Sequence, residues 1–467
     1  MTAVTMAHDP ATWRTLPDRS TPIDHERVAA LMAQEWARFA ATTPASGEHN
    51  ARASRSLPLG VTSSFQHWDP YPISVVSARG AWLTDVDGRQ LLDLSMGFGA
   101  MLVGHLNPVV VEKVKEALEK TGTLFVTPSP TATQVAERYQ QRFGLDRLRF
   151  TNSGTESTMY AVRTARAYTG RKAIVKLEGG YHGGYDALSV SVKPAVADAG
   201  PEDAPTPVTP FEVEAGTVHV VPYNDIDRLR EVLEQSSAEI AAVVMEPVME
   251  NIGIVLPDAG YLAAVRAACD EYGVLLIFDE VKTGLTAGYA GAAKRLGVTP
   301  DLVTLAKSIG GGLPLAAFGG REEVMQAVVD NRMPHFGTYN GNPLVMAAAM
   351  AVDEVCTEAA LDAAEGINDD ALVALDAVIA EYELPAHTVG FGVKGAVTWS
   401  ATPVRNYRDY KRTDFEVAEL SWLWGINRGV LTPPGLDEQW LVSLAHTKDD
   451  MDLLVGEFRD LAEALRA

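Results

Sequence analysis

Cysteine is scarce in this sequence, and its scarcity excludes two classes of protein. The chain has two cysteines, Cys269 and Cys356, with neither a disulfide framework nor a zinc-binding spacing. Both lie in alanine-rich, helix-like surroundings, where a cysteine behaves as a small buried hydrophobic residue. The ten histidines show no metal-ligand spacing either. We therefore expect neither a disulfide-stabilised domain nor a metal site.

Positive charge and long hydrophobic runs are also scarce. The chain has 39 Lys and Arg against 61 Asp and Glu, a net charge of −22, which argues against nucleic acid or an anionic membrane as a partner. No apolar run approaches the roughly 20 residues that a membrane span requires. Residues 1–19 are polar and lack the apolar stretch of a secretory signal. We therefore expect a cytoplasmic protein.

What the sequence does contain is a regular alternation of apolar runs and helical patterns. Hydrophobic residues make up 47% of the chain, which is long enough to bury a large core. Runs such as 240–245 and 274–278 are rich in β-branched residues, as buried strands of a parallel sheet are. Because amphipathic helical patterns separate these runs, we predict an α/β fold with a mostly parallel sheet.

The chain is predicted to divide into three parts. Residues 1–106 form an N-terminal segment and part of a small domain, 107–351 the large domain that carries the sheet, and 352–467 a C-terminal small domain of α+β type. In the first part, we expect a polar linker over 41–56 and a hairpin over 74–94.

Two charged residues stand at the ends of predicted strands. Asp279 follows the apolar run 274–278, and Lys307 follows the run 302–306 and precedes three glycines. Parallel sheets bind ligands at the carboxyl ends of their strands, so both side chains are expected at the ligand edge. This pair suits pyridoxal phosphate, which needs a lysine for its Schiff base and an acid for its pyridine nitrogen. Taken alone, Asp279 could instead cap a helix or bind Mg²⁺, and Lys307 could be a surface lysine.

A candidate anion site follows the strand-like residues 148–150. Ser153, Gly154 and Thr155 open a helix expected over 156–168. Small residues and hydroxyls at a helix N-terminus can form an anion site from unpaired backbone N–H groups. An ordinary N-cap has the same sequence pattern. Because the segment lacks a P-loop pattern, a nucleotide is not favoured.

Two loops add aromatic and hydroxyl side chains. In residues 179–184, Tyr181 and His182 stand between pairs of glycines, where an aromatic ring could stack on a flat cofactor or simply form a turn. We expect His182 to be structural. Thr338 lies in the turn-rich stretch 337–343 and could supply a hydroxyl to a phosphate.

These motifs occur together, in order and at the spacing of the class III aminotransferases of the pyridoxal phosphate fold type I superfamily, which the chain resembles from about Leu57 onward. The likeness rests on residues 153–156, 181–183, 246–247, 279–281 and 337–338. Within this class the chain is most similar to the glutamate-1-semialdehyde aminomutase branch, through residues 246–253, 310–314 and 443–447. The resemblance implies a pyridoxal 5′-phosphate (PLP) cofactor and a homodimer with shared active sites.

The resemblance also implies a role for each matched residue. Lys307 is expected to be the Schiff-base lysine and the proton-transfer base, and Asp279 the partner of the pyridinium nitrogen. The other expected cofactor contacts are Ser153, Gly154 and Thr155 around the phosphate, Tyr181 and Val281 on the two ring faces, Asn251 near the phenolic oxygen, and Thr338, which would reach the phosphate of the neighbouring subunit.

One position departs from the aminomutase branch. Those enzymes hold the substrate carboxylate with an arginine in the N-terminal segment, where this chain has Gln66 and no arginine from residue 57 to 78. A glutamine cannot replace a bidentate, charge-assisted clamp at equal strength. The loop 432–435 also lacks the arginine found in some β-amino acid aminotransferases. Trp68 and Tyr71 instead suggest an aromatic-lined pocket.

We therefore predict a PLP-dependent transaminase. It would move an amino group from an amine or amino acid donor to a carbonyl acceptor by a ping-pong mechanism. The alternative is glutamate-1-semialdehyde 2,1-aminomutase, an isomerase that needs no added acceptor, and a carboxylate clamp from Arg405 or Arg408 would favour it. A cofactor-binding protein without turnover is disfavoured because both Lys307 and Asp279 are present.

Overall fold

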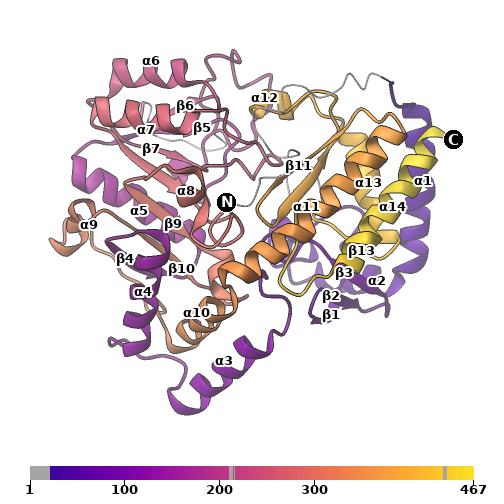
Figure 1. The fold of residues 1–467 in the computed structure, drawn as a ribbon, viewed down its shortest axis with the longest axis horizontal. Helices are drawn as coiled ribbons and strands as arrows, with labels where there is room; N and C mark the ends of the chain where they lie inside the picture. Colours follow the sequence, from indigo (N-terminus) through magenta and orange to yellow (C-terminus); the bar gives the residue numbers. More distant parts are fainter. Residues whose placement is uncertain (1–20, 210–213, 215, 435–438) are drawn as a thin grey trace.

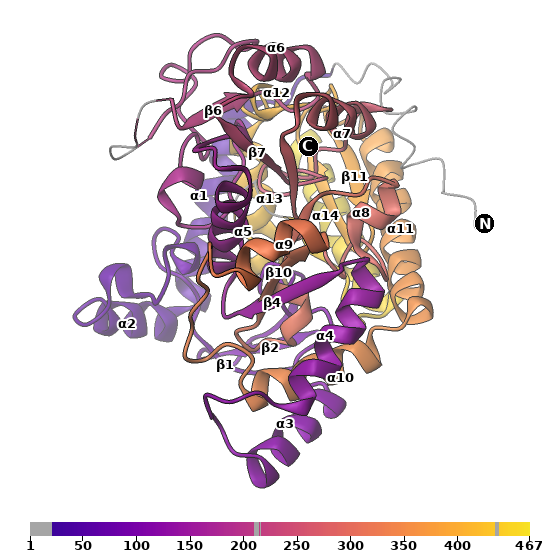
Figure 2. The same ribbon diagram turned by 90° about the vertical axis from the view of Figure 1, so that its left-hand side faces the viewer.

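The structure is a computed structural model that describes residues 21–209, 214, 216–434 and 439–467. In Figure 1 the central sheet and its helices occupy the left-hand side, and a group of long helices from both ends of the chain stands on the right. Figure 2 shows two helices that project from the body, α2 (Pro44–Ala53) and α3 (Pro108–Lys120).

The described residues form a seven-stranded central sheet with the order β4-β10-β9-β8-β7-β5-β6. All neighbouring pairs in the run from β9 to β6 are parallel, whereas β10 is antiparallel to both of its neighbours. This arrangement confirms the predicted α/β fold with a mostly parallel sheet. The strands are β4 (Arg147–Thr151), β5 (Ala173–Leu177), β6 (Val218–Val221), β7 (Ile240–Met245), β8 (Leu275–Asp279), β9 (Leu302–Leu305) and β10 (Ala316–Gly320).

Helices cover both faces of this sheet, which explains why its central strands are continuously apolar. Along β7, Ala242 and Val244 belong to one buried cluster, whereas Val243 and Met245 belong to another on the opposite face. The helices of this region are α4 (Pro130–Phe143), α5 (Gly154–Thr169), α6 (Ile226–Ser236), α7 (Tyr261–Tyr272), α8 (Gly291–Leu296), α9 (Glu322–Val329) and α10 (Pro343–Val355).

Two smaller sheets and the long helices form the rest of the described chain. The short strand β13 pairs parallel with β3, so segments from the two ends of the chain share one sheet. The strands are β1 (Val75–Arg79), β2 (Trp82–Asp85), β3 (Gln90–Asp93), β11 (His387–Phe391), β12 (Lys394–Thr398), β13 (Val430–Leu431) and β14 (Trp440–Leu441). The helices are α1 (His25–Thr42), α11 (Glu358–Glu381), α12 (Tyr407–Tyr410), α13 (Phe415–Asn427) and α14 (Lys448–Arg466).

The polar linker predicted over residues 41–56 is wrong, because helix α2 occupies most of it. Its first turn carries Pro44, which is well suited to the start of a helix. The backbone N–H groups of Ala45 and Ser46 donate to the Asp87 carboxylate at 2.7 and 3.1 Å. This cap comes from the turn between β2 and β3, and the small, polar residues 41–56 carry no local sign of it.

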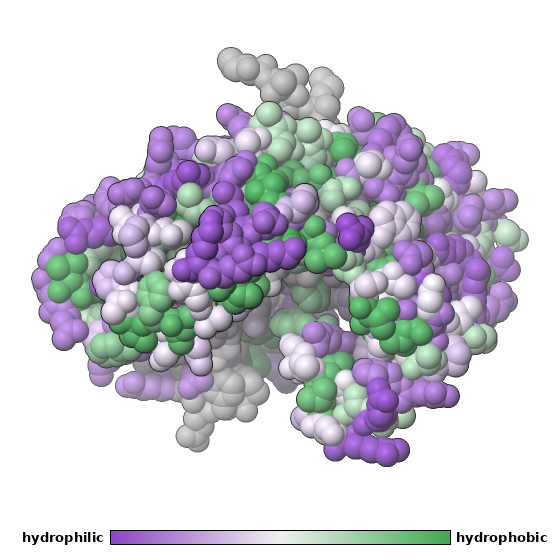
Figure 3. All heavy atoms as spheres, turned by 90° about the horizontal axis from the view of Figure 1, so that it is seen from below, coloured by the Kyte–Doolittle hydropathy of each residue, from purple (hydrophilic) through white to green (hydrophobic). Residues whose placement is uncertain are grey.

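The surface seen from below mixes hydrophilic and hydrophobic residues and is hollowed near its centre (Figure 3). Among the described residues, no helix is both long and apolar enough to cross a membrane. The predicted division at residues 106 and 351 stays a prediction.

Candidate active site

A cavity of about 420 Å³ opens at the carboxyl ends of the central strands. The structure brings together there all but one of the predicted cofactor contacts: Ser153, Gly154, Thr155, Tyr181, Asn251, Asp279, Val281 and Lys307. These residues come from segments far apart in the sequence, and each either ends a strand of the sheet or lies in the segment after one. The shared edge of a parallel sheet is what gathers them.

The Asp279 carboxylate is buried at the end of β8 and has three hydrogen-bond donors around it. His182 Nδ1 lies 2.8 Å from Oδ2, while the Val281 N–H and the Thr304 hydroxyl both donate to Oδ1 at 3.0 Å. Burial by itself would raise the pKa of this carboxyl, but the hydrogen bonds and the His182 ring hold the pKa below its ordinary value. Asp279 is therefore a buried anion, and the predicted structural His182 is the residue that orients it.

Lys307 begins the short helical turn Lys307–Gly310, separated by one residue from the end of β9, and lines the cavity. Its backbone φ is 48°, in the left-handed region that non-glycine residues seldom adopt. Its side chain is half-buried. A lysine in this setting is removed from bulk water without being sealed in the core, as a reactive amine requires.

Helix α5 points its N-terminus at the cavity. The Ser153 hydroxyl accepts from the Glu156 N–H at 3.2 Å, and Ser153, Gly154 and Thr155 all line the cavity. The loop after β5 packs closely on this first turn, because a Cβ at Gly183 would lie 2.5 Å from the Thr155 hydroxyl. The N-terminus of a helix of 16 residues offers backbone N–H groups and positive potential to an anion.

Tyr181, Val281 and Asn251 form further parts of the wall. The Asn251 side-chain amide donates to the Tyr181 carbonyl at 3.1 Å, which fixes two of these residues relative to one another. Burial raises the pKa of the Tyr181 phenol, so the ring is neutral. An aromatic ring and a branched aliphatic side chain thus line the cavity that contains Asp279.

The aromatic lining of the cavity is not the one expected from the sequence. Trp68 packs edge-to-face against Trp422, with ring centroids 5.4 Å apart, and Tyr71 packs against the same buried cluster. The cavity is lined instead by Phe65 and Phe98, whose ring centroids are 5.8 Å apart. A sequence signal for Phe98 existed, because Gly97 and Gly99 frame it as glycines frame the loop of Tyr181.

Two titratable residues of the cavity wall were also not predicted as site residues. Glu246 directly follows β7, and Asp279 ends β8, so the position of Glu246 at a strand end was the available signal. Burial raises its pKa to about 8, although the Lys282 charge acts in the opposite direction. Lys282 is buried, and its ammonium donates to the Glu250 carbonyl at 2.8 Å.

None of the described residues that line this cavity is an arginine. Gln66, at the position expected for a clamp, turns back on its own segment and accepts from the Thr62 hydroxyl at 2.7 Å. Arg405 pairs with Asp258, and Arg408 is buried in a bidentate pair with Glu178 at 2.7 to 3.0 Å. The structure therefore places neither of the two candidate arginines at the cavity.

Thr338 is the one predicted contact that the structure does not bring to this cavity. It is exposed in the turn that follows α9, in a segment tied to the site by the Asn152 amide, which donates to Asn340 at 2.8 Å. Within the described ranges, no group of three His, Cys, Asp or Glu side chains is arranged to hold a metal ion.

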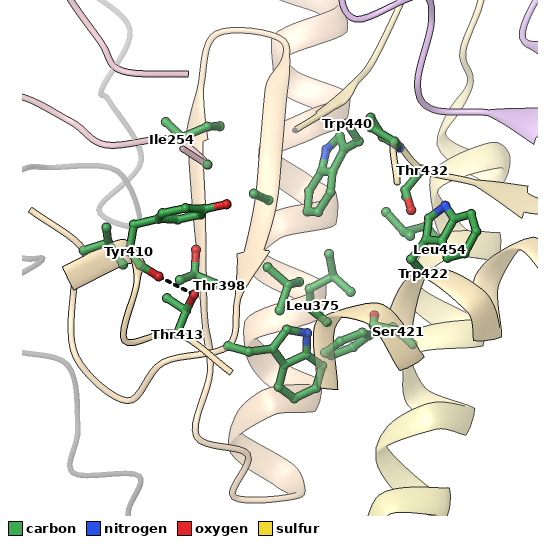
Figure 4. Close-up of a pocket in the computed structure, with 18 of the residues that line it drawn as sticks. Ile254, Leu375, Thr398, Tyr410, Thr413, Ser421, Trp422, Thr432, Trp440 and Leu454 are labelled. Carbon is green, nitrogen blue, oxygen red and sulfur yellow. Dashed lines mark hydrogen bonds between the residues drawn. The ribbon is translucent and has the colours of Figure 1, made fainter. Parts of the chain in front are cut away.

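A second cavity, of about 90 Å³, lies among aromatic side chains of the C-terminal region (Figure 4). Trp422, Trp440 and Tyr410 surround it, and the Thr413 hydroxyl donates to the Tyr410 carbonyl at 2.6 Å. It contains none of the predicted site residues.

The Aminotransferase class-III family matches residues 64–410, which include every residue described at the larger cavity. The chain belongs to this family. The family match, the similar structures that carry the cofactor and the cavity agree on a PLP-dependent enzyme with the fold type I architecture.

Three similar proteins show how far the likeness extends. Glutamate-1-semialdehyde 2,1-aminomutase 2 of Halalkalibacterium halodurans is 37% identical over 420 residues, 89% of this chain and 97% of that protein. A glutamate-1-semialdehyde aminomutase of Pseudomonas aeruginosa PAO1, solved in complex with PMP, superposes with a TM-score of 0.88 at 28% identity, over 95% and 100% of the two chains. An omega-transaminase of Sphaerobacter thermophilus superposes with a TM-score of 0.86 at 33% identity, over 91% of this chain and 98% of that chain.

Proposed function

We propose that this enzyme transfers an amino group between an apolar or aromatic amine or amino compound and a separate carbonyl acceptor. When bound, PLP supplies an aldehyde that captures the amino group and a ring that accepts electrons from the neighbouring carbon. The cavity residues fit such a group, because a lysine, a buried anion and a helix N-terminus line the same wall. The role of each residue at the cofactor is part of this proposal.

Each of these residues would have a defined role at the cofactor. Lys307 would hold the cofactor covalently through Nζ and, once released by the amino donor, move a proton at the substrate carbon. Asp279 would keep a proton on the ring nitrogen, which the lowered pKa of its carboxyl supports. The N–H groups at the start of α5 would bind the phosphate. Tyr181 and Val281 would enclose the two faces of the ring.

The proposed substrate class rests on the absence of arginine among the described residues that line the cavity. A carboxylate that loses its hydration and gains no charged partner binds weakly. Phe65 and Phe98 present apolar surface at the same cavity, and Phe65 also contacts Tyr181 with ring centroids 5.8 Å apart. This combination favours a donor with an aromatic or aliphatic group over one that relies on a carboxylate clamp.

The second candidate is glutamate-1-semialdehyde 2,1-aminomutase, and the similar proteins favour it. The aminomutases found among the relatives include one from Thermus thermophilus that is 39% identical over 89% of this chain. Identity over the whole chain reflects mainly the fold and the cofactor site, whereas substrate choice depends on a few side chains. Gln66 and the paired Arg405 and Arg408 are the side chains that separate this chain from a carboxylate clamp.

A substrate panel tests the proposal. Purified holoenzyme should transfer amino groups from aromatic and aliphatic amines to a keto acid or aldehyde, with parallel initial-rate lines that indicate a ping-pong mechanism. It should convert glutamate-1-semialdehyde to 5-aminolevulinate poorly in the absence of an acceptor. Efficient conversion of glutamate-1-semialdehyde, together with inactivity towards every donor–acceptor pair, would establish the aminomutase instead.

We further propose a homodimer in which each subunit completes the other's site. Thr338 is exposed and lies outside its own cavity, as a residue that serves a neighbouring subunit would. Beside it, Phe336 is 80% exposed, and Val126 in the loop before α4 is 77% exposed. Apolar side chains this open to water are typical of an interface.

A further inference from the structure

A buried lysine stands in the wall of the active-site cavity without a part in the proposed reaction. Lys282 lies three residues after Asp279 and directly after Val281, and its residue is 6% exposed. It lines the same cavity as both of them. Burying an ammonium in the wall costs free energy that an apolar side chain would avoid, so the cost needs an offsetting gain.

A network of three segments fixes the Lys282 side chain. Its ammonium donates to the Glu250 carbonyl at 2.8 Å, next to Asn251. The Glu250 carboxylate in turn pairs with Lys394 Nζ at 2.6 Å, and Lys394 also donates to the Lys282 carbonyl at 3.0 Å. Lys394 comes from β12, so the hairpin of the C-terminal region locks both the lysine and the Glu250–Asn251 turn in place.

The order of substituents on the cofactor ring identifies what this lysine faces. In PLP the aldehyde carbon stands between the arm that carries the phosphate and the phenolic oxygen. With the phosphate at the start of α5 and the aldehyde towards Lys307, the phenolic oxygen must point away from α5. We assign to that side the polar residues Glu246, Asn251 and Lys282, which line the cavity and belong neither to α5, nor to the Lys307 turn, nor to the Asp279–His182 pair.

We propose that the Lys282 ammonium lies beside the phenolic oxygen of the bound cofactor and holds that oxygen in its anionic form. This inference rests on the proposed placement of the phosphate and the aldehyde, and it holds for a transaminase and for an aminomutase alike. A positive charge at this position also disfavours any further proton on the conjugated group between the cofactor and Lys307. Lys282 is thus an electrostatic part of the cofactor site.

The titratable groups around Lys282 decide how large the effect is. Glu246 follows β7, Glu250 lies in the next turn, Asp279 ends β8, Lys394 lies on β12, and Lys307 and Tyr181 line the cavity. Burial raises the pKa of both Glu246 and Tyr181, and the Lys282 charge opposes that rise in each case, so its influence extends into the cavity. Glu246 holds its own proton near neutral pH because burial raises its pKa to about 8.

The test is a pH titration of the visible absorption of the holoenzyme. Lys282→Met removes the charge and the hydrogen bond, whereas Lys282→Gln removes the charge and keeps a donor for the Glu250 carbonyl. The absorption change reports loss of the proton from the conjugated group between the cofactor and Lys307. In both variants its midpoint should rise by about one pH unit or more, since a positive charge a few ångströms from that group has been lost. Lys294→Met, which removes an exposed cation on α8, should leave the midpoint unchanged.

A second measurement, the affinity of the apoenzyme for PLP, should fall several-fold in Lys282→Met and Lys282→Gln and stay near the wild-type value in Lys282→Arg. The inference would be overturned if the midpoint moved in neither neutral variant, or if Lys282→Gln alone kept the wild-type midpoint. In either case a coloured, active wild-type enzyme would leave the proposed function intact. A wild-type protein that binds no PLP would overturn both.

Discussion

At the end of β8, three donors surround a carboxylate that burial alone would neutralise. His182, Thr304 and the Val281 backbone together keep Asp279 ionised, and His182 is itself buried with a pKa lowered by burial. A neutral imidazole that donates from Nδ1 is therefore the partner of an anionic Asp279. Because His182 is neutral, the negative charge of Asp279 remains able to pair with a cationic group inside the cavity.

Replacing Asp279 with Asn keeps the shape of the side chain and removes its charge. The rate of amino transfer should fall by about a hundredfold, since losing a preorganised charge at a developing site costs on the order of 3 kcal/mol. Single-turnover kinetics at saturating donor would measure this change. A loss of less than about threefold would mean that Asp279 does not serve the ring nitrogen.

Glu246 should make the stability of the apoprotein fall as the pH rises. Its pKa in the folded protein is about 8, above the ordinary value of 4.5, so the folded state retains a proton that the unfolded chain releases between these pH values. Stability from this residue is therefore full below about pH 4.5 and is lost as the pH approaches 8. Glu246→Gln should remove this dependence and gain on the order of 1–3 kcal/mol over wild type between pH 5 and 8.

Urea unfolding of both proteins at pH 5 and pH 8 measures this difference. Gln is the matched replacement because its carbonyl oxygen can still accept from the Glu250 N–H, as Glu246 does at 3.0 Å. We expect the two stabilities to diverge as the pH rises. A gap that is the same at both pH values would show that Glu246 is ionised throughout.

The loop after β5 and the first turn of α5 pack together at the end of the cavity where we propose that the phosphate binds. Gly183 has a φ of 91°, and the Gly184 N–H donates to the Thr155 hydroxyl at 3.2 Å. A Cβ at Gly183 would lie 2.5 Å from the Thr155 hydroxyl and 2.7 Å from its Cα, whereas a Cβ at Gly184 would meet nothing within 4 Å. A side chain at Gly183 would therefore clash with Thr155, whereas a side chain at the adjacent Gly184 would not.

Gly183→Ala should weaken PLP binding by at least tenfold, because the loop must move away from the anion site. Gly184→Ala is the matched control and should bind PLP as the wild type does. Fluorescence titration of the two apoproteins with PLP gives both affinities. Equal affinities for the two variants would mean that the contact between the loop and α5 has no part in holding the phosphate.

How much the sequence could predict differs between elements. The central strands and the residues at their ends were predictable, because a sheet buried on both faces needs continuous apolar runs and gathers the residues after those runs at one edge. Helix α2 was not predictable, since the residue that caps its N-terminus, Asp87, is distant in the sequence. Trp68 and Phe65 lie three residues apart, and only tertiary packing decides that Trp68 meets Trp422 while Phe65 meets the cavity.

For the whole molecule, the proposed shared active site makes a complementation experiment possible. Lys307→Ala subunits and Thr338→Ala, Asn340→Ala subunits should each be weakly active or inactive alone. Mixing them with exchange of subunits should restore part of the activity, because a mixed dimer contains one site with both Lys307 and its partner's Thr338 intact. Sedimentation would confirm the dimer. Full activity in a sedimenting monomer would contradict the shared site.

The central claim is that the cavity beside Asp279 is where amino groups are transferred, with Lys307 as the residue that holds the cofactor. Borohydride reduction of the yellow holoenzyme, followed by peptide mapping with mass spectrometry, tests it most directly. We expect the reduced cofactor to be attached to Lys307 alone and Lys307→Ala to show no measurable amino transfer. Cofactor attached to a different lysine, or near-normal turnover by Lys307→Ala, would contradict it.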